Sequence, residues 1–175
     1  MPAQILTSLH GREIGLDSDG NLVLRRGSKV HLQGSARIVN VTAATLSIDE
    51  AIHEGKTVTL NRAAGIAVTL PAATGSGAGY RFFVGTTVTS NTTTIKVANS
   101  SDIMVGAAIQ AADAGNTSNM FETAATDDTI TFNGSTTGGI KGDLVELEDI
   151  AANTWSVRVI GAATGAEATP FSATV

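Results

Sequence analysis

The motif VTLPAATGSGAGYRFFV, residues 68–84, separates two possible fold classes for this chain. An apolar run leads into glycines at alternate positions, as at the start of a phosphate-binding turn. Such a turn needs a helix behind it, because the free N–H groups and the dipole at a helix N-terminus hold the anion. Here residues 80–84 form an aromatic and β-branched run, and no Gly-x-Gly-x-x-Gly spacing or Gly-Lys-Ser/Thr ending is present. The motif therefore predicts a strand, a glycine-rich turn and a second strand.

Similar strand candidates follow one another from Val39 to Ile160. Each is short, rich in Val, Ile, Thr or aromatic residues, and bounded by Gly, Asn, Asp or Pro. They are residues 39–46, 57–61, 66–70, 80–84, 93–98, 129–132, 144–147 and 155–160. In residues 56–61, Val58 and Leu60 alternate with polar residues, which predicts an antiparallel strand with one solvated face. Residues 129–139 and 143–161 predict antiparallel connections.

Helix is scarce, with only 47–54 and 107–114 as short candidates. Because no βαβ alternation is present, we expect an all-β fold, an antiparallel β-sandwich or jelly-roll-like body over residues 39–175 with little helix. Residues 1–38 predict an N-terminal β-hairpin arm, since residues 14–16 and 22–24 flank an Asp-Gly turn signal at 17–21. Val30 and Leu32 suggest one further half-buried strand.

The composition limits the possible partners. Charged residues make up 15% of the chain and aromatic residues 4%, against roughly 25% charged in an average soluble domain. A surface with so few charges suits packing against copies or partners. The net charge of −5 divides into +2 over residues 1–40 and −7 over the rest, which disfavours non-specific nucleic-acid binding. The N-terminus lacks the pattern of a signal peptide, so we expect synthesis in a cytoplasm and no membrane contact.

No pattern in the sequence indicates a catalytic, metal-binding or cofactor-binding site. The chain has no cysteine, which excludes disulfides and thiol nucleophiles. Asp17 begins a run like a calcium loop, but the sixth and twelfth positions are Leu22 and Ser28, where glycine and glutamate are needed. The three histidines are scattered, and no Gly-x-Ser-x-Gly elbow is present. We therefore expect no catalytic, metal-binding or cofactor-binding residues, and interpret Trp155, on an alternating run, as a core residue.

Three segments of the chain resemble structural proteins of tailed bacteriophages. They are residues 55–98, residues 128–161, which contain GDLVELEDIAANTWSV, and the C-terminal run ATGAEATPFSATV, residues 163–175. The resemblance implies a virion component without catalytic residues. The expected role is a non-enzymatic capsid decoration or cement protein on the outer surface of the head, assembled in the cytoplasm of the host bacterium.

The expected partners are the major capsid protein and further copies of the chain, as a homotrimer matching the local symmetry of the shell. The mildly basic arm is the expected capsid contact, through strand-edge pairing. Its candidate residues are Arg12, Ile14, Leu16, Leu22, Leu24, Arg25, Arg26 and Lys29. Two alternatives stay open: a tail-fibre or receptor-binding module, which would need surface aromatics, and a small enzyme, which would need a convergent polar pocket.

Overall fold

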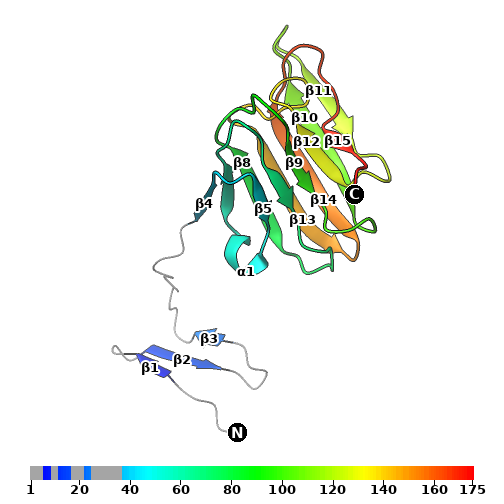
Figure 1. Cartoon of the computed structure of the whole chain (residues 1–175). Helices are drawn as coiled ribbons and strands as arrows, with labels where there is room; N and C mark the ends of the chain where they lie inside the picture. The colour runs from blue at the N-terminus through cyan, green and yellow to red at the C-terminus, as the bar shows by residue number, and fades with distance from the viewer. Residues whose placement is uncertain (1–5, 9–11, 17–21, 25–36) are drawn as a thin grey trace. The chain divides into compact units, whose positions relative to one another are not determined.

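A computed structural model describes residues 6–8, 12–16, 22–24 and 37–175, the last with their side chains (Figure 1). The chain separates into two compact units, Met1–Ser35 and Ala36–Val175. This division lies three residues before the boundary expected at residue 38. The second unit is called the body below.

The first unit contains a three-stranded antiparallel sheet in the order β1-β2-β3. Its strands are β1 (Leu6–Ser8), β2 (Arg12–Leu16) and β3 (Leu22–Leu24). Strands β2 and β3 pair as the sequence predicts, with Leu16 opposite Leu22, so the hairpin is confirmed. Strand β1 was not predicted, because three residues with one leucine are too few to show alternation. The turn at 17–21 and the strand expected at Val30 and Leu32 lie outside the described residues.

The body is an all-β sandwich of two sheets, as the sequence predicts (Figure 1). One sheet contains β4 (Ile38–Val41), β6 (Thr57–Leu60), β8 (Gly79–Val84), β10 (Ile103–Ala111), β11 (Ser118–Glu122), β13 (Leu144–Ala151) and β14 (Thr154–Ala162), in the order β11-β10-β14-β13-β8-β6-β4. The other contains β5 (Thr45–Ser47), β7 (Ala67–Thr69), β9 (Thr93–Lys96), β12 (Thr129–Phe132) and β15 (Phe171–Ser172), in the order β15-β12-β9-β7-β5.

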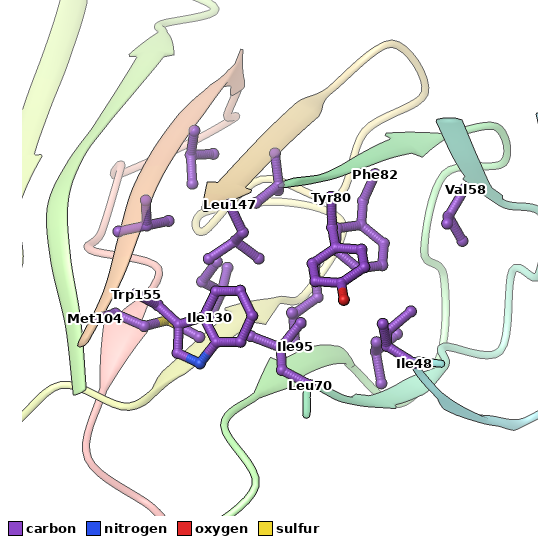
Figure 2. Packing of buried hydrophobic residues seen from close by; sticks show 14 of the residues in the cluster. Ile48, Val58, Leu70, Tyr80, Phe82, Ile95, Met104, Ile130, Leu147 and Trp155 are labelled. Carbon is purple, nitrogen blue, oxygen red and sulfur yellow. The ribbon is translucent and has the colours of Figure 1, made fainter. Parts of the chain in front are cut away.

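The core lies between these sheets and is built from the inward residues of both (Figure 2). Trp155 of β14 is fully buried, as expected, and its ring lies 5.8 Å from that of Tyr80 in β8. Phe82, Ile95 and Ile130 are also fully buried. Burial of large side chains at roughly 1.5–3 kcal/mol each is the main stabilisation available to a chain without disulfides.

Both sheets are mixed, and here the expected antiparallel detail is wrong. From β4 to β9 the chain alternates between the sheets, and each strand from β6 onward lies parallel to the strand two before it. Parallel strands need a crossover, and in this body the crossover contains a strand of the opposite sheet. Strand β6 is thus parallel to both neighbours, although Val58 and Leu60 are buried as expected. The jelly-roll detail stays a prediction.

Of the two predicted antiparallel connections, one is confirmed. Strands β13 and β14 form a hairpin, with Leu147 opposite Val157. Strand β12 instead pairs with β9 and β15 in the smaller sheet. The segment after β12 therefore crosses to the larger sheet, where β13 begins. The Asn-Gly signal at residues 133–134 marks a turn but does not show which sheet the chain enters next.

One of the two predicted helices is present, and it is the only helix in the part of the chain that the structure describes. Helix α1 (Glu50–His53) begins after Asp49, whose side chain accepts a hydrogen bond from the amide of Ala51, and Gly55 follows it at φ 65°. The helix expected at 107–114 is wrong, because β10 runs through it between β14 and β11. Alanines favour a helix, but the pairing on both sides overrides that preference.

Candidate interaction surface

The predicted arm residues fall into two groups. Arg12, Ile14 and Leu16 lie in β2, and Leu22 and Leu24 lie in β3. The register brings four of them together as two cross-strand pairs, Ile14 opposite Leu24 and Leu16 opposite Leu22. The remaining predicted residues, Arg25, Arg26 and Lys29, lie outside the described residues.

The glycine-rich loop binds an anion, and the anion is a side chain of the protein itself. The carboxylate of Asp149, 2% exposed, accepts hydrogen bonds from the amides of Thr74, Gly75 and Ser76 at 2.7–3.0 Å and from the hydroxyls of Thr74 and Ser76. Burial alone raises the pKa of Asp149, but these hydrogen bonds outweigh it and hold the pKa well below its usual range. The loop is thus already occupied, and β8 follows it where a nucleotide site needs a helix.

Two other aspartates hold loops in the same way. Asp128 accepts from the amides of Thr174 and Val175 near the C-terminus, and these bonds, with one from Thr129, outweigh the effect of burial and lower its pKa. Asp143 accepts from three amides, but there burial dominates and raises its pKa. With Asp102 and Asp127, five acids of the body are buried. Five of the sixteen acids in the sequence are therefore buried and absent from the surface.

An apolar row crosses five neighbouring strands on the outer face of the larger sheet, the face turned away from the core. Its members stand opposite one another in the strand register, in the order Met120, Ile109, Ile160, Leu144 and Phe83. Met120 is 69% exposed, Ile160 48% and Ile109 40%, and the other two are half-buried. Single exposed apolar residues are ordinary, but a contiguous set marks an interaction site.

A charged row runs beside the apolar row on the same face. In register, its order is Glu122, Ala107, Arg158, Glu146 and Arg81. Arg158 and Glu146 stand opposite each other on neighbouring strands and form an ion pair at 3.3 Å. Both side chains are well exposed, so the pair adds little stability. The signs along this row alternate.

A groove of about 740 Å³, called the outer groove, lies over this charged row. Small residues such as Ala107 and Ser156 form part of its lining. Of the seven bases in residues 36–175, four line the outer groove, namely Arg37, Lys56, Arg81 and Arg158, together with the acids Glu146 and Glu148. The groove therefore concentrates the bases of a chain that is acidic in total.

The apolar row was not predicted from the sequence. Ile109 was assigned to a helix that is absent, and β11, which carries Met120, was not predicted. Residues 118–122, Ser-Asn-Met-Phe-Glu, show no apolar–polar alternation that would indicate this strand. Which strands carry neighbouring members of the row depends on pairing that no local pattern contains.

Within residues 37–175 and the three short strands of the arm, no group of three or more His, Asp or Glu side chains is placed to hold a metal ion. The same described residues contain no helix with the length and apolar character needed to span a bilayer. Comparison of the chain with models of protein families, with curated proteins and with solved structures finds no match in any of the three.

Proposed function

We propose that this chain is a non-enzymatic decoration or cement protein of a tailed-bacteriophage head, which binds the outer capsid surface and bridges subunits of the major capsid protein. The observation that carries the proposal is the division of the chain into a small β-sheet unit and a separate sandwich body. The resemblance of residues 55–98 and 128–161 to phage structural proteins supports the same role.

The first unit is the proposed capsid contact. Among the described strands of its sheet, β1 and β3 lie at the two edges, and an edge strand offers N–H and C=O groups for strand addition to a partner. Each contact of this kind need not be strong, because a homotrimer would attach at three places at once and gain from the raised effective concentration.

The body supplies rigidity in this proposal. Loops held by Asp128, Asp143 and Asp149 and a core between two sheets make a unit that keeps its shape when neighbouring subunits move. A clamp acts by this stiffness and needs no reacting group. The expected location is therefore the outside of the virion head, with no nucleic acid and no membrane as partner.

Binding to undecorated heads tests the proposal. The full chain is mixed with heads that lack it, and co-sedimentation is compared with that of residues 37–175 alone and of a full-length variant carrying Ile14→Asp and Leu24→Asp. We expect the full chain to sediment with heads and both variants to stay in solution. Circular dichroism of the two variants controls for folding of the body.

Two results would overturn the proposal. Failure of the full chain to bind heads would remove the role itself, and undiminished binding by both variants would remove the arm as the contact. Antibody labelling of purified virions gives an independent readout, because a signal at the tail tip would favour the tail-fibre or receptor-binding alternative over decoration of the head.

A further inference from the structure

The outer face of the larger sheet has the composition of a surface that is buried in a contact with another protein. Three of the eight exposed large apolar side chains of residues 37–175, Met120, Ile109 and Ile160, are consecutive in the apolar row. The row begins at β11, an edge strand of this sheet, and crosses from there toward the middle strands. A soluble protein rarely leaves such a contiguous set in water.

The size of this face fits a stable protein contact. Seven strands spaced roughly 4.8 Å apart span about 30 Å, and the nine-residue strands β10 and β14 are about 30 Å long. The other five strands are shorter, with four to eight residues each, so the face covers roughly 700 Å², close to the roughly 800 Å² that each partner buries in an interface of ordinary size. One copy of a similar face is enough to cover it.

The charges on the outer face indicate which kind of partner can bind there. An anionic polymer would meet the bases of the outer groove, but it would also meet Glu122, Glu146 and Glu148. A partner surface that itself combines both signs with apolar side chains avoids that repulsion. The chain carries such a surface, because its charged row alternates in sign beside the apolar row.

We propose that the outer face of the larger sheet is the surface through which a second copy of this chain binds, with the charged row across the middle of the strands and the apolar row beside it, toward the C-terminal ends of β10 and β14. The outer groove gives room for side chains projecting from that copy. A face that binds the same face of a second copy closes as a twofold dimer. The inference therefore goes beyond the proposed homotrimer, which needs a different contact, and it does not rest on capsid binding.

Self-association of the full chain in solution tests the proposal by sedimentation equilibrium over a range of protein and salt concentrations. We compare the natural chain with a variant carrying Ile109→Asp and Ile160→Asp, and with Ile52→Asp as the matched control. Ile52 is 52% exposed, as much as Ile160, but lies in α1 outside the sheet. Thermal unfolding checks that all three proteins are folded.

The natural chain and the Ile52→Asp control are expected to associate, and the double variant to associate about 100-fold more weakly, because each aspartate would place an unpaired charge among the apolar side chains of the interface. Salt is expected to weaken the natural assembly through the charged row. A natural chain that is monomeric throughout, or a double variant that assembles as strongly, overturns the proposal. A double variant that still self-associates but no longer binds heads would also overturn it, because the outer face would then be the contact with the capsid protein.

Discussion

Asp149 connects two distant parts of the chain at the scale of a single residue. Its carboxylate accepts five hydrogen bonds from residues 74–76 across a sequence separation of more than seventy residues. The glycine at position 75 has φ 79°, which lets three consecutive amides turn toward one carboxylate. The glycine-rich pattern thus has the anion-binding geometry that its composition suggests, with an internal ligand.

Replacement of Asp149 by asparagine should destabilise the body by about 3 kcal/mol at pH 7, because one accepting oxygen becomes a donor facing N–H groups. Urea unfolding measures this change. The neighbouring exposed Glu148→Gln is the control and should change stability by less than about 0.5 kcal/mol. Equal losses in the two variants would contradict the assigned role of Asp149.

The same residue should make stability depend on acid. The pKa of Asp149 is depressed in the folded state, so its contribution is present above the unfolded pKa of about 3.9 and is lost as pH falls toward the folded value. The difference in unfolding free energy between the natural chain and Asp149→Asn should therefore narrow at pH 3. A difference that is constant from pH 7 to pH 3 would contradict this prediction.

At the scale of elements, the segment between β12 and β13 carries the chain from one sheet to the other. Gly134, at φ 78°, packs so closely against Val88 that a Cβ atom there would lie 1.7 Å from the carbonyl oxygen of Val88. Such an approach leaves no room for any side chain, and it places the crossing segment firmly against the loop before β9.

Gly134→Ala should therefore cost at least about 3 kcal/mol in unfolding free energy, from backbone strain and from the clash with Val88. Gly77 gives a matched control, because it has the same φ of 78° but no atom within 4 Å of its Cβ position. Gly77→Ala should cost only about 1 kcal/mol, the strain alone. Denaturant unfolding of both variants measures the two losses of unfolding free energy. Equal losses would show that the close approach of Gly134 to Val88 adds no cost beyond the backbone strain.

The elements also show where local patterns succeed and fail. The hairpin of β13 and β14 was predictable because its strands adjoin in sequence and close through a tight turn at Asn153, which has φ 61°. The parallel pairing of β6 with β4 and β8 was not predictable. Alternation of apolar and polar residues indicates that one face of a strand is solvated, but it does not indicate whether the neighbouring strand runs parallel or antiparallel.

At the scale of the whole molecule, the described core belongs to the body alone. A chain of residues 37–175 should therefore unfold in one cooperative transition, with a midpoint within a few degrees of that of the full chain. Differential scanning calorimetry of the two proteins makes the comparison. A body that fails to fold without residues 1–36 would show that the arm contributes to folding as well as to binding.

The sequence by itself determined the all-β class, the hairpin of the arm and the inward positions of Val58, Leu60 and Trp155. These follow from alternation and turn residues, which act over a few positions. Only the tertiary structure decided the parallel pairing, the carboxylate inside the glycine-rich loop and the apolar row from Met120 to Phe83. Each of these depends on segments that meet across the two sheets, and the free energy of such meetings comes from burial and pairing between distant residues that no local pattern records.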